Sequence, residues 1–263
     1  MPAKKPRVLA VANQKGGVAK TTTVASLGAA LAELGARVLL VDLDPQACLT
    51  FSLGIDPEDV ELSVHHVLTK GVDPFEVIIE TEDGVDLLPA TIELARAEAD
   101  LLTRTGREHV LKLALEDLGE GRDAYDWILL DCPPSLGVLT VAALTAARGV
   151  LIPLQCETLS HRGVGQLLDT VHDVRRFTNR KLEVWGVLPT LYDGRTNHAR
   201  AVLDNISESY QLDVIEPPIP KSIRFAEAPA AGRSILATTR HHRGADAYRE
   251  VAASLNQRAR RTP

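Results

Sequence analysis

The stretch "ANQKGGVAKTTT", residues 12–23, stands between a short apolar run and a helical pattern. It contains Lys20-Thr21, the ending of the phosphate-binding pattern G-x-x-x-x-G-K-[ST]. That pattern also requires glycine at the positions that Gln14 and Ala19 occupy. The stretch therefore keeps the lysine and the hydroxyl of such a loop but departs from it in its glycines.

The glycines of this loop are Gly16 and Gly17, which stand between two lysines. Glycines let a backbone approach an anion without a Cβ in the way, and a helix that starts near Lys20 directs its positive end to the same place. Ala19 fits if its backbone already has helical dihedrals. Lys20 is then predicted to contact the β- and γ-phosphates of a nucleotide, and the Thr21 hydroxyl to bind Mg²⁺. The predicted nucleotide-binding residues of the loop are Gly16, Gly17, Val18, Ala19, Lys20, Thr21 and Thr22.

Apolar runs rich in Val, Ile and Leu alternate with helical patterns along the chain. This order is typical of βαβ units and predicts an α/β fold, with a doubly wound, mostly parallel sheet and helices on both faces. Residues 1–263 are expected to form a single domain. Strands are predicted at "RVLAVA" (7–12), "RVLLVD" (37–42), "VDLLPA" (85–90), "DWILLD" (126–131), "GVLIPL" (149–154) and "LEVWGVLP" (182–189). Helices are predicted at residues 20–35, 160–177 and 196–210, and the acidic stretch 55–125 is expected to be less regular and helical.

Acidic residues close two of these strands. Asp42 and Asp44 end "RVLLVDLDPQ", and Asp131 ends "WILLDCPPS". The carboxyl ends of parallel strands face the crevice in which open α/β sheets bind ligands. Asp131 suits a carboxylate on the metal side, acting through water, and Asp44 at the mouth suits the positioning of an attacking water.

Composition and charge limit the class of protein. A chain of 263 residues, 45% hydrophobic and 24% charged, can bury a substantial core. The run from Val8 to Ala12 is too short to span a bilayer, and "MPAKKPR" precedes no long apolar segment, so a cytoplasmic protein is expected. The net charge is −6, yet nine Lys/Arg stand against three Asp/Glu from Lys221 onward. An acidic protein can therefore still carry a basic face.

Six stretches, in order along the chain from Arg7 to about Tyr248, carry a family resemblance. They resemble the ParA/Soj partition ATPases of the deviant Walker A class, which also includes MinD. The loop of that family is K-G-G-x-[GA]-K-[ST], which accounts for glycines set between two lysines. The resemblance implies a P-loop NTPase fold of the deviant Walker A type. The stretches are "KGGVAKTT", "VDLDPQ", "LLDCPPSLG", "PLQCETLSHRGVGQLL", "PTLYDGRTNHA" and "IPKSIRFAEAPAAGRSI".

The resemblance implies a homodimer formed with ATP, in which the first lysine of the loop reaches the partner's site. Lys15 would then act like an arginine finger, as a cation against the charge that develops on the transferred phosphoryl group. It further implies Lys15 and Asp44 as catalytic residues, with Asp44 orienting the hydrolytic water. The implied cofactors are ATP and Mg²⁺. The residues that it assigns to the metal are Thr21, Asp42 and Asp131. It adds to the nucleotide site Lys15, Glu157, near the partner's ribose, and Pro218.

The same resemblance implies a Mg²⁺-dependent ATP hydrolase that binds DNA without sequence preference and drives chromosome or plasmid partition. Its partners would be non-specific DNA and a ParB-type activator protein, its location the nucleoid, and no membrane would be involved. No helix-turn-helix extension precedes residue 7, so autorepression at a specific operator is not expected. The implied DNA-binding residues are Arg195, Arg200, Lys221, Arg224 and Arg233.

Two other functions share the predicted site. A MinD-like or cargo-positioning ATPase needs a C-terminal amphipathic helix for the membrane. The last helical segment offers Tyr248, Val251 and Leu255 at helical spacing, which we expect to lie in the core. A metabolic ATP-dependent ligase on the same scaffold, such as a dethiobiotin synthase or an amidotransferase-linked ligase, needs a second substrate pocket. The segments "RTNHA" and "IRFAEAP" favour partition.

Overall fold

The structure is a computed structural model that describes residues 5–119, 124–157, 160–194 and 197–261. Within them, seven strands form one sheet in the order β3-β4-β2-β5-β1-β6-β7. All neighbouring strands are parallel except the edge pair β3 and β4. The predicted fold class is therefore confirmed. The strands are β1 (Arg7–Val11), β2 (Val38–Asp42), β3 (Ile79–Glu80), β4 (Asp86–Leu88), β5 (Trp127–Asp131), β6 (Gly149–Gln155) and β7 (Glu183–Thr190).

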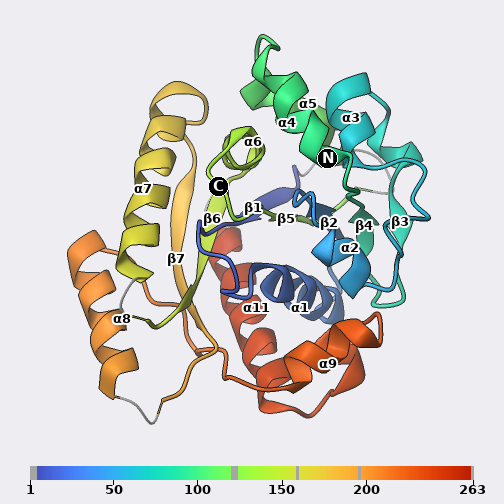
Figure 1. The fold of residues 1–263 in the computed structure, drawn as a ribbon. Coiled ribbons are helices and arrows are strands. Elements are labelled where there is room, and N and C mark those ends of the chain that lie inside the picture. The colour runs from blue at the N-terminus through green and yellow to red at the C-terminus, as the bar shows by residue number, and fades with distance from the viewer. Residues whose placement is uncertain (1–4, 120–123, 158–159, 195–196, 262–263) are drawn as a thin grey trace.

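Helices cover both faces of this sheet (Figure 1). The α-helices are α1 (Lys20–Glu33), α2 (Cys48–Ser52), α3 (Val64–Lys70), α4 (Leu94–Leu102), α5 (Val110–Leu115), α6 (Val138–Ala146), α7 (Ser160–Phe177), α8 (Asn197–Tyr210), α9 (Arg224–Ala230), α10 (Ile235–Thr238) and α11 (Arg243–Arg261). Three short 3-10 helices within the described ranges are η1 (Pro74–Glu76), η2 (Arg107–His109) and η3 (Glu116–Gly119).

Two hydrophobic cores lie on opposite faces of the sheet. Leu39 and Val41 of β2 point into the core that residues of α3 to α8 complete, whereas Leu40 points into the core that α1, α10 and α11 complete. Figure 1 shows the sheet between these two layers. Because both faces are covered, β2 and β5 are buried along their whole length, as their unbroken apolar runs predict.

Helix α1 packs close against the sheet. A Cβ on Gly28 would come within 2.6 Å of the Leu40 side chain, so the helix packs at a distance that glycine permits. Gly35 follows the helix with a φ of 82°, a left-handed conformation that ends a right-handed helix. The N–H of Ala36 then donates to Leu31 O in the last turn. The amino end of α1 lies at the carboxyl edge of the sheet, after the loop that leaves β1.

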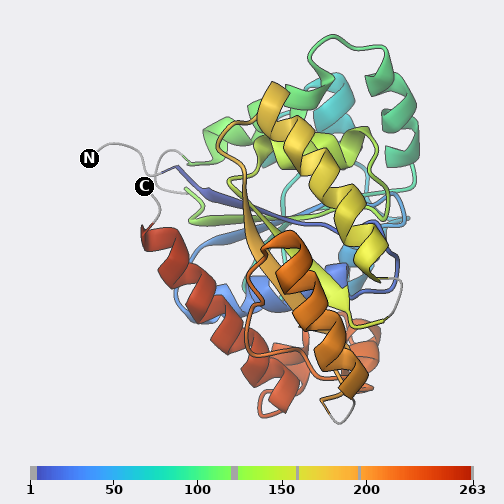
Figure 2. The ribbon, with the colours of Figure 1, turned by 90° about the vertical axis from the view of Figure 1, so that its left-hand side faces the viewer.

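Helix α11 packs along α1 and uses its apolar face in doing so. Tyr248, Val251 and Leu255 are buried in the core, as predicted. The Tyr248 hydroxyl lies 3.0 Å from the Thr23 hydroxyl of α1. In Figure 2 the end of α11 lies near the start of β1, where Arg7 donates to Asn256 at 3.1 Å. Among the described residues, none of the helices combines the length and apolar character that crossing a bilayer requires.

The acidic stretch 55–125 completes one edge of the molecule. Its described residues form α3, α4 and α5, which cover one face of the sheet, so the helical expectation is confirmed. They also form β3, the edge strand that the sequence does not reveal because it is only two residues long. This stretch supplies side chains to the core on the face that it covers.

Candidate functional site

The loop between β1 and α1 is anchored at both ends by buried polar side chains. Near its start, Asn13 Nδ2 donates to Pro153 O at 2.8 Å, and Asn13 Oδ1 accepts from Lys15 N at 3.0 Å. Near its end, Thr190 Oγ1 donates to Val18 O at 3.0 Å. Motif spacing misses both anchors, although an asparagine directly after an apolar strand is a weak signal. The ends of β6 and β7 therefore form the back of the loop.

Two residues of the loop have left-handed backbone conformations. Gly17 has a φ of 73°, and Ala19, directly before α1, has a φ of 63° and a ψ of 35°. The helical dihedrals that would make Ala19 acceptable at this position are therefore not present. The conformation is the one that glycine adopts without strain, so the glycine of the common pattern has a physical reason at this position. An alanine side chain here costs about 1–2 kcal/mol.

The two lysines of the loop have different surroundings. Lys20 is only 8% exposed, and its Nζ donates to Lys15 O at 3.2 Å. Burial lowers the pKa of Lys20, and the nearby Asp131 carboxylate opposes that shift. The Lys15 ammonium lies at the surface, where it forms an ion pair with Glu157 of the same chain. The structure thus brings Lys15 and Glu157 together within one subunit.

Two strand-end carboxylates lie opposite each other beside this loop. Asp42 and Asp131 are paired in the register of β2 and β5, and both are fully buried. Asp42 accepts from Thr50 N at 2.9 Å, from Thr50 Oγ1 at 2.8 Å and from Asp44 N at 3.1 Å. Burial raises the pKa of Asp42 to about 6, although the hydrogen bonds from Thr50 oppose the shift.

Asp131 differs from Asp42 because neither of its carboxylate oxygens has a hydrogen-bond partner of good geometry among the described residues. Burial and the neighbouring Asp42 raise the pKa of Asp131 well above its usual range, and the Thr21 hydroxyl and the Lys20 ammonium oppose the shift. Buried polar oxygens are rarely left without partners. A hydrated cation would supply both the missing donors and the missing positive charge. Thr21, Asp42 and Asp131 are therefore a suitable set of oxygen groups for Mg²⁺.

Asp44 lies at the mouth of the site, two residues beyond the end of β2. Its Oδ1 accepts from Gln46 N at 3.0 Å, and its side chain is only partly buried. The carboxylate is therefore fixed by the turn that leads into α2 while it keeps access to solvent. This placement suits a group that contacts water beside the phosphate loop.

The predicted DNA-binding residues that the structure describes lie on segments after β7 and differ in their contacts. Arg195 is outside the described residues. Arg200 donates to Gly194 O at 3.4 Å, and Arg224 pairs with Glu227 at 2.8 Å in an exposed bridge. Lys221 is exposed. None of these facts tests DNA binding, which stays a prediction.

Arg233 and Pro218 have defined surroundings. The Arg233 guanidinium is held by Glu82, at 2.8 Å, and by the buried Asp83. A DNA phosphate would have to displace these carboxylates. Pro218 precedes Ile219, whose N donates to Pro189 O at 2.8 Å, so the predicted nucleotide contact lies on a segment that runs beside β7.

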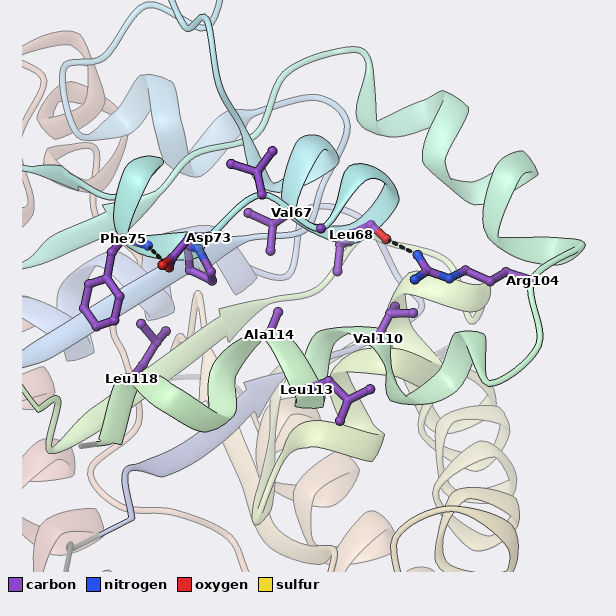
Figure 3. A pocket seen from close by; sticks show the side chains of 12 residues that line it. Val67, Leu68, Asp73, Phe75, Arg104, Val110, Leu113, Ala114 and Leu118 are labelled. Carbon is purple, nitrogen blue, oxygen red and sulfur yellow. Dashed lines mark hydrogen bonds between the residues drawn. The ribbon is translucent and has the colours of Figure 1, made fainter.

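A hollow of about 340 Å³ lies between α3, η1 and α5. Figure 3 shows Val67, Leu68, Val110 and Leu113 around it, with Arg104 donating to Leu68 O. Its lining includes none of the described residues of the phosphate loop or of the two acidic strand ends. It therefore does not extend the nucleotide site.

Comparison with known proteins places the chain in a family. Residues 6–184 match the AAA domain family. The chain is 44% identical over 250 residues to the sporulation initiation inhibitor protein Soj of Bacillus subtilis, a match that covers 95% of this chain and 98% of that protein. It is 40% identical over 255 residues to the chromosome partitioning protein ParA of Caulobacter vibrioides, with 97% and 95% covered. The chain belongs to the ParA/Soj family of ATPases. The resemblance drawn from the sequence motifs is confirmed.

A solved structure adds information about ligands. The fold is similar to that of a protein described as cobyrinic acid a,c-diamide synthase from Mycobacterium smegmatis, with 55% identity, a TM-score of 0.86, and 97% of this chain and 96% of that chain covered. That protein was solved with ADP and magnesium and also with an ATP analogue and magnesium. These ligands agree with the cofactors that the sequence of this ParA/Soj-type ATPase predicts.

The left-handed Ala19 leads to a stability prediction. Ala19→Gly is expected to raise the free energy of unfolding by about 1 kcal/mol, because glycine adopts this conformation without a Cβ penalty. Denaturant unfolding followed by the fluorescence of the buried Trp127 and Trp185 measures it. Ala201→Gly, on the exposed face of α8, is the matched control and should lower the same free energy by about 1 kcal/mol. A loss of similar size in both variants would contradict the backbone assignment at Ala19.

The unpartnered carboxylate leads to a second prediction. Asp131→Asn is expected to stabilise the nucleotide-free protein by about 1–3 kcal/mol at pH 8, because it removes a buried charge. This gain in stability should shrink as the pH falls toward 5. The raised pKa of Asp131 means that its carboxyl is increasingly protonated in the folded protein as the pH falls, so there is less buried charge for the substitution to remove. Thermal unfolding across pH measures this.

Asp42→Asn is the control, because that side chain accepts three hydrogen bonds and should gain less or lose stability. Asp131→Asn should also lose most of the stabilisation that Mg²⁺ adds to bound ADP. An Asp131→Asn protein that is less stable than wild type at every pH would contradict the interpretation of this carboxylate.

Proposed function

We propose that this protein is a partition ATPase that pairs on ATP and binds DNA. ATP and Mg²⁺ bind at the loop from Lys15 to Thr22, ATP joins two copies of the chain, and the paired chains bind DNA without sequence preference. A ParB-type protein bound to DNA then stimulates hydrolysis, which releases the pair at the nucleoid. The cargo is a chromosome or a plasmid.

One observation carries this proposal: a loop with two lysines faces two buried strand-end carboxylates in a chain that is 40–44% identical to ParA and Soj proteins. Lys20 and the N–H groups of the loop bind the β- and γ-phosphates. Thr21, Asp42 and Asp131 would hold Mg²⁺, which would supply positive charge beside the phosphates. Asp44 orients the attacking water from the mouth of the site.

Lys15 serves the partner's site in this proposal, so it must exchange Glu157 of its own chain for the partner's phosphate. The pair is exposed, with 34% of the Lys15 side chain and 51% of the Glu157 side chain accessible. Exposed ion pairs contribute about 0–1 kcal/mol, so this exchange is easily driven by a desolvated phosphate contact. In this proposal Glu157 then contacts the partner's ribose.

The membrane-positioning alternative receives less support. A membrane helix must offer its apolar face to lipid. In α11 the residues that form this face, Tyr248, Val251 and Leu255, are at most 1% exposed and pack in the core with α1. Detaching them would expose a large part of that core.

A ligase is a second candidate, because the protein at 55% identity is described as a cobyrinic acid a,c-diamide synthase. Such an enzyme couples ATP to amide formation and needs a site for a second substrate beside the γ-phosphate. The deciding experiment measures ATP hydrolysis by one preparation with a DNA duplex plus a ParB-type protein, and separately with cobyrinic acid plus an ammonia source. Stimulation by the first pair supports partition, and amide product with the second overturns it.

The different roles proposed for Asp44 and Lys15 can be tested directly. Asp44→Ala should hydrolyse ATP at least about tenfold more slowly and accumulate an ATP-bound dimer, because water is no longer oriented while the phosphate contacts remain. Lys15→Ala should bind ATP but dimerise more weakly, because the cation that serves the partner is lost. Light scattering with ATP and Mg²⁺ measures the dimer. A monomeric Asp44→Ala protein, or a fully dimeric Lys15→Ala protein, would overturn these roles.

The predicted DNA face can be tested at Arg224, whose exposed partner Glu227 a phosphate can replace. Arg224→Ala should lower DNA affinity equally for two unrelated duplexes and reduce the salt slope by about 1 for each chain of the pair. Basal ATP hydrolysis should stay unchanged. Arg176→Ala on α7 is the matched control, because it removes the same charge from another exposed position. If both variants lose affinity equally, the DNA face is not at Arg224.

A further inference from the structure

A buried hydroxyl joins the phosphate loop to the strand at one edge of the sheet. Thr190 is the last residue of β7, and its Oγ1 donates to Val18 O at 3.0 Å. Thr190 is 0% exposed and Val18 is 1% exposed. Because solvent cannot replace this bond, its loss leaves the Val18 carbonyl without a donor at that place. The phosphate loop and the end of β7 are therefore fixed to each other.

The chain that follows Thr190 is strained and then fixed again. Leu191 has a φ of 50°, which is uncommon for a residue with a side chain of this size. Tyr192 N donates to Ile219 O at 2.9 Å, and Lys221 N donates to Tyr192 O at 3.3 Å. Strain of this kind persists only where bonds on both sides hold it. Thr190 supplies the bond on one side of Leu191, and Tyr192 supplies those on the other.

The segment bonded to Tyr192 also runs along β7 before it reaches α9. Ile215 N donates to Val187 O at 2.8 Å, and Ile219 N donates to Pro189 O at 2.8 Å. Residues 219–221 are therefore held from positions on both sides of Thr190. Shortly after Lys221 comes Arg224, the first residue of α9. A short bonded path thus leads from the phosphate loop to two of the cations proposed for DNA.

We propose that Thr190 is a positioning residue that couples nucleotide binding to the arrangement of residues 191–194 and 219–224. Phosphate binding orders the loop and fixes the Val18 carbonyl, which keeps the Thr190 bond and the strained conformation of Leu191. Without that bond, Leu191 relaxes and the backbone that carries Lys221 and Arg224 shifts. The test of this inference by DNA affinity rests on the proposed function. The inference adds a route by which ATP controls the DNA-binding face within each subunit.

A purely structural bond makes a different prediction. Losing it would lower the stability of the protein in every ligand state equally. The ratio of DNA affinities with and without ATP would then stay the same. If the Thr190 bond couples the two sites, its loss changes this ratio. Nucleotide bound at the phosphate loop then no longer affects the conformation of residues 191–194 and 219–224.

The test compares three variants. Thr190→Val removes the hydroxyl donor and keeps the shape of the side chain, and Thr190→Ser keeps the donor. Thr145→Val is the control: Thr145 is also a buried threonine, 1% exposed, and the substitution removes its hydroxyl contact with Thr178. DNA affinity is measured with ATP and Mg²⁺ and without nucleotide. Thr190→Val should reduce the ratio of the two affinities about tenfold. Thr190→Ser and Thr145→Val should keep the wild-type ratio.

Amide hydrogen exchange gives a readout that needs no DNA. ADP with Mg²⁺ should slow exchange at Tyr192, Ile219 and Lys221 in wild type and Thr190→Ser, but not in Thr190→Val. If Thr190→Val keeps both the affinity ratio and the nucleotide-dependent protection, the coupling is overturned. If the wild-type protein shows no DNA affinity at all, the proposed function fails. In that case, equal nucleotide-dependent protection from exchange in wild type and Thr190→Val would still overturn the coupling.

Discussion

The electrostatic balance around Asp131 is the constraint on which the rest of the site depends. A fully buried carboxylate without hydrogen-bond partners of good geometry in the described structure lies beside a second buried carboxylate, Asp42, and one buried ammonium, Lys20. Desolvation makes each charge expensive, so their combination is tolerable only where positive charge can be added. The parallel register of β2 and β5 places the two carboxylates opposite each other. The start of α1 then brings Lys20 and Thr21 to the same edge.

Much of this arrangement could be predicted from the sequence because it depends on local patterns. Strands covered on both faces are apolar throughout, so the positions of β1, β2, β5, β6 and β7 can be recognised from their apolar runs. The end of α1 can be recognised from Gly35. What could not be predicted depends on distant partners. Asn13 bonds to Pro153, 140 residues away, and Thr190 bonds to Val18, 172 residues away. Spacing within a motif carries no information about such bonds.

The backbone at Ala19 departs from local preference. Alanine strongly favours the right-handed helix, so its position before a helix suggests helical dihedrals. The loop overrides this preference because it must turn sharply between an anchored Val18 and the first turn of α1. The contacts of Arg233 on the surface likewise depend on distant residues, and its role in DNA binding stays a prediction. Its segment resembles a DNA face, whereas the fold brings Glu82 and Asp83 to its guanidinium from about 150 residues away.

The chain separates the chemistry of the nucleotide from the surfaces proposed to respond to it. Lys20, Asp42 and Asp131 stand after β1, at the end of β2 and at the end of β5, whereas the segments proposed to bind DNA follow β7. The back of the phosphate loop touches both parts, because Asn13 bonds to β6 and Thr190 of β7 bonds to Val18. A loop fixed in this way cannot change its shape without breaking these buried bonds or moving the ends of β6 and β7. In the proposed coupling, the response to nucleotide passes through these strand ends, whichever partner reads it.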